Sequence, residues 1–382
     1  MLWRLLNLVV KEIVEVLYSP VKAFKKVIEK PDFKGVLIIL LLVIGATVAL
    51  QFVYNSKQYY EIRAPTNDDW TESIANSHLW TSSGSISLDT TDYQMGNSSI
   101  LSSAPDSKND WLKLTDIESV NCSGATGYTE LFFWINWTNQ NAASPTSATI
   151  KLYSGSETSY FERDITNMLG SNSEWKNITL NVGPEQGWAS SNAPDWQNIT
   201  GIEIQLDWTN QANLDLDIDG IYFNVFLSPL ESVGLTEAAL FILVSVTFSV
   251  GINWVLWAGI MFISARLFGE DMSPWNNFFI IIGYAFIATA VYTIISALIF
   301  TSLPTIYMPV EADRQLIVFS ETWLPNIGYQ IGTIILWAGE VWIAALSAIV
   351  IRLIKNVPWG KAATIAAVAF LIRFVLRFFF GF

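Results

Sequence analysis

The chain has 382 residues, of which 52% are hydrophobic, and 21 basic against 34 acidic side chains give it a formal net charge of −13. A mean hydropathy of +0.37 excludes an ordinary soluble enzyme, because the apolar residues gather in runs that match bilayer spans. With one Cys (Cys122) and one His (His78), the chain can form no intrachain disulfide and lacks the ligands of a His/Cys metal centre.

Residues 1–34 are predicted to form an amphipathic leader on the cytoplasmic side of a membrane. Apolar residues recur at helical spacing up to Leu17, whereas Arg4, Lys11 and Glu15 share the opposite side. Such a helix can lie on the membrane surface. It can equally pack as a cap on the inner end of a helical bundle, and the pattern fits both.

Five apolar runs reach the length of about 20 residues that a helix needs to cross a bilayer. The first run (35–54) follows the leader directly, and the other four belong to residues 231–382. We therefore expect a polytopic α-helical bundle of five spans. The predicted spans are 35–54, 235–264, 276–300, 329–351 and 362–380.

Basic residues near the span ends predict the orientation, because cytoplasmic loops carry an excess of Lys and Arg. The leader is rich in lysine, and two later loops on the same side carry Arg266 and the group Arg352, Lys355 and Lys361. The N-terminus is therefore expected in the cytoplasm. Residues 56–230 and the C-terminus are expected outside the cell.

Short motifs recur around the membrane spans. They are 19–24 (SPVKAF), 31–35 (PDFKG), 266–269 (RLFG), Phe278 and 283–285 (GYA). Together with the five-helix count, they resemble the Yip family, which comprises the Ypt/Rab-interacting proteins and their prokaryotic relatives. The resemblance covers roughly residues 17–54 and 235–382. It implies a five-helix membrane fold and, for eukaryotic members, an association with membrane traffic and small GTPases; the large insert departs from the simple family pattern.

Residues 56–230 are predicted to form an all-β domain inserted after the first span. The insert has 7 basic against 22 acidic residues, and Gly, Asn, Ser and Pro clusters separate segments in which apolar and polar residues alternate. About eight or nine short strands without helical segments predict a β-sandwich. The expected strands are 85–89, 98–102, 111–114, 130–137, 148–153, 160–164, 175–181, 201–208 and 214–226.

The insert also contains an ordered set of strand motifs. They are Trp80 with 85–87 (SIS), 96–100 (GNSSI), 175–180 (WKNITL), 202–206 (IEIQL) and 218–223 (IDGIYF). Their order resembles the galactose-binding-like or carbohydrate-binding-module jelly roll. The resemblance implies a binding module, in which related sandwiches often hold a structural calcium between the first and last strands. A fold alone does not identify a ligand.

Five tryptophans in or beside polar loops are the candidate glycan-binding residues. Indole rings can stack on the apolar faces of sugar rings, so a Trp-rich sandwich favours a glycan or a glycosylated surface protein as the ligand. The alternative is that these indoles fill the sandwich core; two or three exposed in one patch would favour binding. The candidates are Trp70, Trp80, Trp188, Trp196 and Trp208.

Asp215, Asp217 and Asp219 alternate along one predicted strand, so their carboxylates are expected to share a face. Three carboxylates on one side repel one another unless they are solvated or bridged by a cation, and calcium takes oxygen ligands of this kind. A solvated acidic face is the alternative. The residues predicted to bind a structural calcium are Asn67, Asp68, Asp69 and Asp219.

Five Asn-x-Ser/Thr sequons lie in the insert, on the side predicted to face outward. Asn, Ser and Thr are so common in this segment that the motif is weak evidence for a glycoprotein. An acidic, disulfide-free exterior with sequons is compatible with an archaeal cell surface. The candidate glycosylation residues are Asn97, Asn121, Asn136, Asn177 and Asn198.

Glu340 and Arg373 are expected to pair inside the bundle. Each lies 12 residues from a basic residue at the cytoplasmic end of its helix, which at 1.5 Å per residue puts both about 18 Å deep. A charge left alone there costs a few kcal/mol or more. The pair can be a clasp that fixes two helices or part of a proton or ion path.

No enzyme motif is present: the chain has no paired Ser and His and no phosphate-binding glycine loop between a strand and a helix.

The preferred hypothesis is a non-catalytic, membrane-anchored binding or scaffold protein that presents a glycan-binding sandwich outside the cell. One alternative is a transport or lipid-handling protein that uses the Glu340–Arg373 pair. Another is an accessory subunit of a larger membrane complex. The expected partners are the bilayer, glycans and other membrane subunits, and not nucleic acid.

Overall fold

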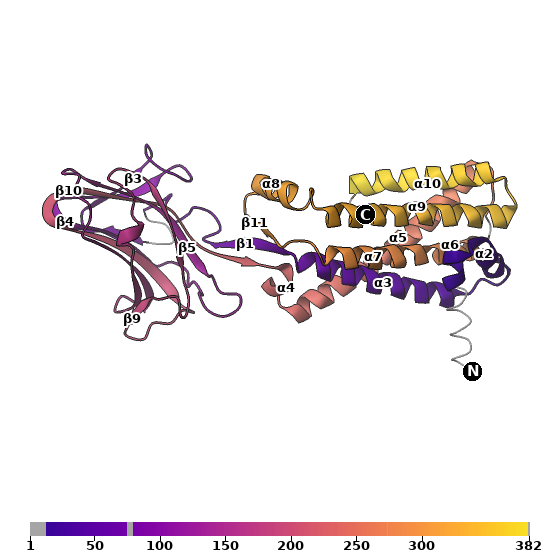
Figure 1. Cartoon of the computed structure of the whole chain (residues 1–382), viewed down its shortest axis with the longest axis horizontal. Coiled ribbons are helices and arrows are strands. Elements are labelled where there is room, and N and C mark those ends of the chain that lie inside the picture. The colour runs from indigo at the N-terminus through magenta and orange to yellow at the C-terminus, as the bar shows by residue number, and fades with distance from the viewer. Residues whose placement is uncertain (1–12, 75–78, 273, 381–382) are drawn as a thin grey trace. The chain divides into compact units, whose positions relative to one another are not determined.

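The computed structural model describes residues 13–74, 79–272 and 274–380 and divides the chain into two compact units (Figure 1). The membrane unit joins Met1–Tyr59 to Ser228–Phe382, and the sandwich unit is Tyr60–Leu227. The first part of the predicted leader, residues 1–12, lies outside the described residues.

Within the described residues, five helical segments of the membrane unit are long and apolar enough to cross a bilayer, as predicted. Uninterrupted apolar residues favour these helices, because a helix satisfies its backbone hydrogen bonds internally in lipid. A short 3-10 turn, η2 (Tyr284–Phe286), joins the two parts of the third span. The spans are α3 (Phe33–Asn55), α5 (Leu235–Leu267), α6 (Trp275–Gly283) with α7 (Ile287–Phe300), α9 (Ile327–Lys355) and α10 (Trp359–Phe380).

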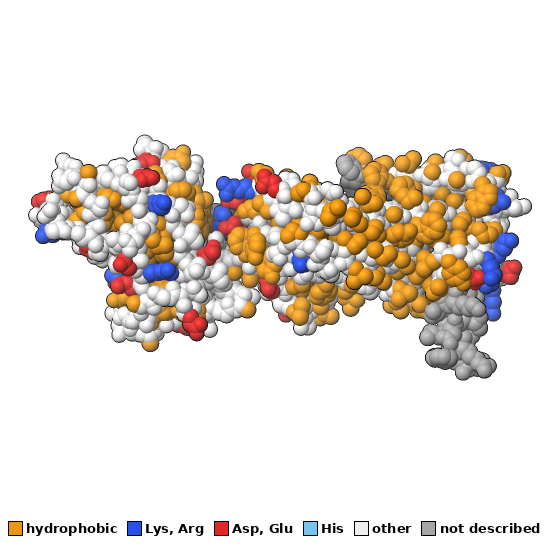
Figure 2. Space-filling model, viewed as in Figure 1, with side chains coloured by type: hydrophobic (Ala, Val, Ile, Leu, Met, Phe, Trp, Pro, Cys, Tyr) orange, Lys and Arg blue, Asp and Glu red, His pale blue; other side chains and the backbone are white. Residues whose placement is uncertain are grey.

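Hydrophobic side chains cover these helices in Figure 2, and Lys and Arg gather at one end of the membrane unit. Glycines and a buried indole allow the helices to approach closely. Gly332 of α9 faces the ring of Phe300 of α7, and Ser296 Oγ donates to the Gly332 carbonyl over 2.9 Å. Trp257 of α5 is fully buried, and its Nε1 donates to Ser347 Oγ of α9 over 3.0 Å.

The described part of the leader packs on the bundle and so fits the cap alternative. Helix α2 (Pro20–Glu29) contacts α6 and α9 and buries Phe24 and Val27 in the same core as the spans. Glu15, which the helical pattern placed on the polar side, is instead 3% exposed and pairs with Lys22 (3.2 Å) and Lys26 (2.5 Å).

Two short elements of the membrane unit were not predicted, β11 (Ile306–Met308) and α8 (Ala312–Thr322). Ile306 N donates to Lys57 O over 2.8 Å, which ties the loop after α7 to the chain that leaves α3. Trp323 just after α8 is fully buried, and its Nε1 donates to Pro304 O over 2.9 Å.

The sandwich unit is an antiparallel β-sandwich, as predicted (Figure 1). Strands β4 (Ser99–Thr115) and β10 (Ile199–Leu227) pair with each other and run through both layers. In the layer that we call the β6 sheet, the first half of β10 pairs with β6 (Ser147–Ser156). In the β5 sheet, its second half pairs with β5 (Glu130–Asn139). The other strands are β1 (Gln58–Ala64), β2 (Leu79–Ser82), β3 (Ser85–Asp89), β7 (Ser159–Asp164), β8 (Lys176–Asn181) and β9 (Ala189–Ser191).

The strand predictions failed mainly by dividing the two longest strands. Predicted strands 98–102 and 111–114 are both parts of β4, and predicted strands 201–208 and 214–226 are both parts of β10. The polar residues between them suggested loops, but register shifts between Asp207 and Leu214 allow the pairing to continue as the strands pass from one sheet to the other. Strands β1, β2 and β9 were missed.

Helix α3 offers a matched pair of glycines for testing the packing of the bundle. A methyl group on Gly35 would lie 1.9 Å from Tyr284 Oη, whereas nothing lies within 4 Å of the corresponding position on Gly45. The Tyr284 ring is 1% exposed, and its hydroxyl donates to the Asp32 carbonyl over 3.0 Å, so it cannot move away without cost.

We predict that Gly35→Ala destabilises the detergent-solubilised protein by about 1–3 kcal/mol, the usual cost of overpacking. Gly45→Ala should leave the thermal unfolding midpoint unchanged. Equal midpoints for the two variants would contradict this close packing of α3.

Candidate functional site

The outer face of the β5 sheet, which points away from the sandwich core, gathers aromatic and polar side chains. Alternate residues of β5 lie in the core, so Phe132, Trp134 and Asn136 fall on the outer face. Phe132 and Trp134 are partly exposed and meet edge to face, with ring centroids 6.4 Å apart. Strand register sets Trp134 beside Asn177 of β8 and Asp219 of β10.

Trp175 and Asp92 extend this face beyond the start of β8. Trp175 Nε1 donates to Asp92 Oδ1 over 2.7 Å, and Asn136 Nδ2 donates to Asp92 Oδ2 over 3.5 Å. Asn136 is 5% exposed, and its buried Oδ1 has no hydrogen-bond partner. A buried acceptor left unsatisfied costs about 1–3 kcal/mol, so a hydroxyl or water donor at this place would stabilise the face.

The Asp residues of β10 share the same outer face, as their spacing predicts. Asp215 accepts from Ser103 Oγ over 2.6 Å, and Asp217 accepts from Ser99 Oγ over 3.3 Å. Burial, reinforced by the negative charge of Asp89, raises the pKa of Asp217 to about 7. This part of the face is therefore rich in hydrogen-bond acceptors and poor in positive charge.

Asp219 is fully buried and holds the loop that follows β3. Its Oδ2 accepts from the backbone N–H groups of Gln94 (2.6 Å) and Met95 (2.7 Å). Thr71 Oγ1 donates to Asp68 and lies 3.2 Å from Asp219 Oδ1, which links the two carboxylates.

Of the four residues predicted to bind calcium, the structure brings Asp68 and Asp219 together, while Asn67 and Asp69 are exposed. Asp68 Oδ2 is buried without a hydrogen-bond partner. Burial, with the charges of Asp219, Glu72 and Asp69, raises the pKa of Asp68 to about 6. No three Asp, Glu, His or Cys side chains in the described ranges are arranged to hold a metal ion, so any cation here would also need backbone, amide or water oxygens.

Three of the five predicted glycan-binding tryptophans lie in the sandwich core. Trp70, Trp80 and Trp208 are 7%, 4% and 4% exposed. Trp80 Nε1 donates to the Trp70 carbonyl over 2.7 Å, and Trp208 Nε1 donates to the Ala143 carbonyl over 2.8 Å. The prediction is wrong for these three, because their rings are buried among other side chains and present no face to a ligand.

The other two candidates, Trp188 and Trp196, meet in one partly exposed patch near β7 and β9. Their ring centroids are 5.9 Å apart, and Trp196 stacks on Phe161 at 3.7 Å with an angle of 11°. The Arg163 guanidinium lies over the Trp188 ring at 5.9 Å. Both indoles also pack against the sandwich core, so less of their surface is open than the loop position suggested.

The sequons divide by exposure. Asn136 is buried on the outer face of the β5 sheet, so the glycosylation prediction is wrong at this residue. Asn97 and Asn121 are exposed, and Asn177 and Asn198 are partly exposed, so glycosylation at these four residues stays a prediction.

In the membrane unit, Glu340 of α9 and Arg373 of α10 lie together. Arg373 Nη1 donates to Glu340 Oε2 over 2.6 Å, and Nη2 is 3.3 Å from Oε1. Asn253 Oδ1 of α5 accepts from the same guanidinium over 3.4 Å, and the Trp257 ring lies 5.3 Å from its Cζ.

The pair lines a partly open hollow of about 810 Å³, which we call the chamber, together with residues of α3, α5, α7, α9 and α10. The lining includes the polar side chains Asn253 and Thr293 as well as aromatic rings.

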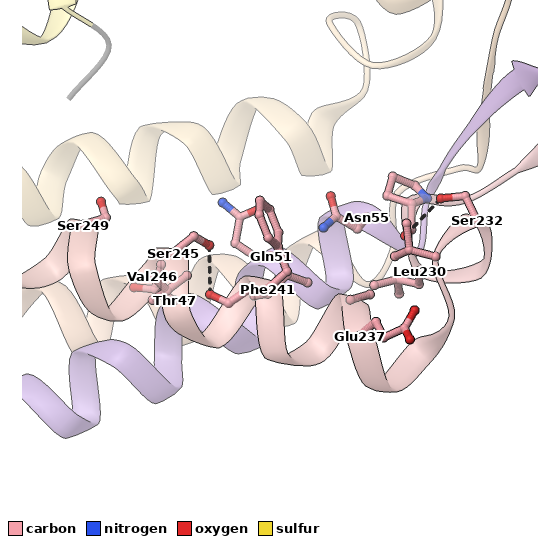
Figure 3. Close-up of a pocket in the computed structure, with 14 residues that line it drawn as sticks. Thr47, Gln51, Asn55, Leu230, Ser232, Glu237, Phe241, Ser245, Val246 and Ser249 are labelled. Carbon is pink, nitrogen blue, oxygen red and sulfur yellow. Dashed lines mark hydrogen bonds between the residues drawn. The ribbon is translucent and has the colours of Figure 1, made fainter.

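A second hollow, a groove of about 770 Å³, lies between α3 and α5. It shares the lining residues Thr47, Gln51 and Ser249 with the chamber. Figure 3 shows the polar residues of this groove spread from Ser249 to Asn55 and Ser232.

The sequence-based candidates did not include Phe132, Trp134 and Trp175 of the outer face, because those candidates were tryptophans in or beside polar loops. The alternation of β5 could have found the first two. Phe133 and Trp137 of β5 point into the core, so the alternation places the rings of Phe132 and Trp134 on the outer face.

Several solved structures are similar to part of this chain, and no curated protein matches its sequence. One is a family 11 carbohydrate-binding module from Clostridium thermocellum, with a TM-score of 0.28 and 11% identity over 39% of this chain and 88% of that one. A family 30 carbohydrate-binding module has a TM-score of 0.29 and 13% identity over 37% and 73% of the two chains. An exo-β-agarase has a TM-score of 0.31 and 11% identity over 44% of this chain and 25% of its own. Likenesses at these scores assign no ligand.

The bundle has a family match in sequence. The model of the Yip1 domain matches residues 203–380, which include all but the first four residues of β10 and the four spans that follow the sandwich. The resemblance found in the motifs around the second and third spans is thereby confirmed. This chain is a multi-pass membrane protein whose residues 203–380 match the model of the Yip1 domain.

Proposed function

We propose that this protein is a non-catalytic, membrane-anchored binding protein whose sandwich unit binds a glycan on the outer face of the β5 sheet. The observation that carries the proposal is the set of rings on that face, Phe132, Trp134 and Trp175, among amide and carboxylate side chains. Rings of this kind can stack on the apolar faces of sugars, while amides and carboxylates hydrogen-bond sugar hydroxyls.

The polar groups of this face match a neutral ligand rich in hydroxyl groups. Asp92 holds Trp175 and Asn136 in place, and the unpartnered Asn136 Oδ1 can accept one more hydrogen bond. Asp215 and Asp217 add acceptors, so an anionic ligand is disfavoured. This ordered surface favours the β5 sheet over the Trp188–Trp196 patch, where Trp196 is stacked on Phe161.

The orientation is part of the proposal. Lys and Arg gather at the end of the membrane unit where α2 packs (Figure 2), and such residues favour the cytoplasm. The sandwich unit would then stand outside the cell, where glycans and glycosylated proteins are found.

A cation beside Asp68 and Asp219 is a second part of the proposal. Four carboxylates in this region repel one another, and the buried Asp68 Oδ2 lacks a donor. Calcium accepts carboxylate, amide and carbonyl oxygens in flexible geometry. Residues 67–69 and Asp219 would supply part of the ligand set, and the ion would fix the loop before β2 against β10.

A second function is favoured by the chamber that surrounds the Glu340–Arg373 pair. A hollow of about 810 Å³ that carries polar and charged side chains among apolar spans is the feature expected of a transport or lipid-handling protein. The pair alone can serve as a clasp between α9 and α10, so the chamber rather than the pair supports this function.

We predict that Trp134→Ala weakens oligosaccharide binding at least tenfold, or about 1.4 kcal/mol, because it removes the central ring of the face. Binding would be located with an array of neutral tetra- and hexasaccharides and measured by titration of the purified chain. The matched control is Trp188→Ala, which removes a partly exposed indole from the other patch and should leave affinity unchanged. The reverse pattern would move the site to that patch.

The raised pKa values predict how the sandwich responds to pH and calcium. Asp217 and Asp68 titrate near 7 and 6 when folded, against about 3.9 when unfolded. At a pH between the unfolded and the folded pKa values, the folded state therefore binds more protons than the unfolded state. The free energy of unfolding then falls as pH rises from about 4 to about 8. Ionised Asp217 alone costs on the order of 2–4 kcal/mol at pH 8.

Hydrogen exchange of β10 amides, corrected for intrinsic rates, should show less protection at pH 8 than at pH 5. Calcium at pH 8 should restore it, and Asp68→Asn should weaken the calcium effect. The exposed Glu118→Gln is the control for charge alone. Greater protection at pH 8 without calcium would refute the pKa argument, and no calcium effect in the parent protein would refute the cation site.

The Glu340–Arg373 pair gives a prediction about stability. Glu340→Gln or Arg373→Met alone leaves a charge in an apolar unit, which costs about 3–5 kcal/mol. The double variant should be milder than either one, as thermal unfolding in detergent would show. Additive losses would contradict the pairing.

If the chamber conducts protons, proteoliposomes that contain the protein should show a larger proton flux than protein-free vesicles, and Glu340→Gln should remove the excess. No excess flux would reject that function.

A further inference from the structure

The groove between α3 and α5 belongs to the membrane unit and is separate from the glycan face proposed above. It has a volume of about 770 Å³ and is lined by α3, by α4 (Pro229–Ser232) and by the first half of α5. Its polar residues on α3 are Thr47, Gln51 and Asn55; the first and last are eight positions apart, which is about 12 Å along the helix. The groove therefore runs from the last turn of a span into the bilayer.

The groove opens sideways toward lipid. Phe241, which lines it, is 75% exposed, and the neighbouring residues Leu240 and Val244 of α5 are 58% and 67% exposed. Apolar side chains so exposed on a membrane span face hydrocarbon. A membrane lipid can therefore enter from this side while its acyl chains stay in the hydrocarbon.

The polar side chains of the groove require a partner at that depth. Among the described residues, the side-chain amides of Gln51 and Asn55 form no hydrogen bond. An amide without a partner in an apolar medium costs about 2–7 kcal/mol. Ser245 and Ser249 across the groove add hydroxyl groups, and Ser245 Oγ already donates to the Ile242 carbonyl over 3.0 Å (Figure 3).

Charge decides which headgroup fits. Among the described residues that line the groove, Glu237 is the one ionisable side chain, and none is a Lys or Arg. A phosphate headgroup would meet a carboxylate and no cation, which is unfavourable. Hydroxyl groups, which both donate and accept, match the amides of Gln51 and Asn55 and the serine hydroxyls.

We propose that the groove between α3 and α5 binds the sugar headgroup of a glycosylated membrane lipid, with the acyl chains lying along the exposed side of α5. Gln51 and Asn55 donate to and accept from the sugar hydroxyls, and Glu237 accepts near the mouth. Gln51 and Thr47 also line the inner chamber, so a bound headgroup lies against its polar wall. This site does not depend on the β5 sheet or on Trp134.

Native mass spectrometry of the full chain in detergent tests the proposal, with a monoglycosyl diacylglycerol and a phosphatidylglycerol of the same acyl chains as probes. We expect the glycolipid to bind at least tenfold more tightly than the phospholipid. Gln51→Leu should remove most of this preference. The control Thr247→Val changes a polar residue of α5 that does not line the groove, and it should leave the preference unchanged.

Several results would overturn the proposal. Equal affinity for the two lipids would reject the headgroup assignment, and an unchanged preference in both Gln51→Leu and Ser249→Val would reject the groove. Competition by the soluble sugar without acyl chains would place binding in the sandwich instead. Trp134→Ala separates the two sites, because it should weaken soluble oligosaccharide binding while leaving glycolipid binding intact.

Discussion

The alternation of side chains along β5 and β10 is the constraint on which the sandwich unit depends. The observed register of β10 places Leu214, Leu216 and Ile218 in the core. It places the alternating residues Asp215, Asp217 and Asp219 on the outer face. A shift by one residue would exchange the two sets and point the carboxylates into the apolar core. The same register of β5 turns Trp137 inward and Trp134 outward, so the core and the outer face of the β5 sheet arise from a single pairing.

Carboxylates hold this face in position as well as lining it. Asp219 binds the backbone of residues 94 and 95, and Asp92 joins Trp175 to Asn136. Both contacts connect a loop to a sheet that alternation has already ordered. The cost is a set of buried acidic groups whose raised pKa values make the sandwich sensitive to pH.

The sequence predicted most of the architecture where one physical signal dominated. Span length identified the five spans, and strict alternation located β3, β5 and β7 to within a few residues. Long-range effects were missed. Nothing local shows that β4 and β10 bend through both sheets, or that Glu15 is neutralised by Lys22 and Lys26 of the next helix. Three tryptophans were wrongly predicted to face a ligand, because the burial of a side chain depends on tertiary contacts. The Glu340–Arg373 contact, in contrast, could be predicted from the depth of each residue along its span.

The central claim is that a glycan lies on the outer face of the β5 sheet. An experimental map of the full chain with a bound oligosaccharide tests it most directly. The account predicts density for a sugar ring stacked on Trp134, with hydroxyl groups near Asn136 and Asp215. Sugar density only at the Trp188–Trp196 patch, or none on the sandwich at saturating oligosaccharide, would contradict it.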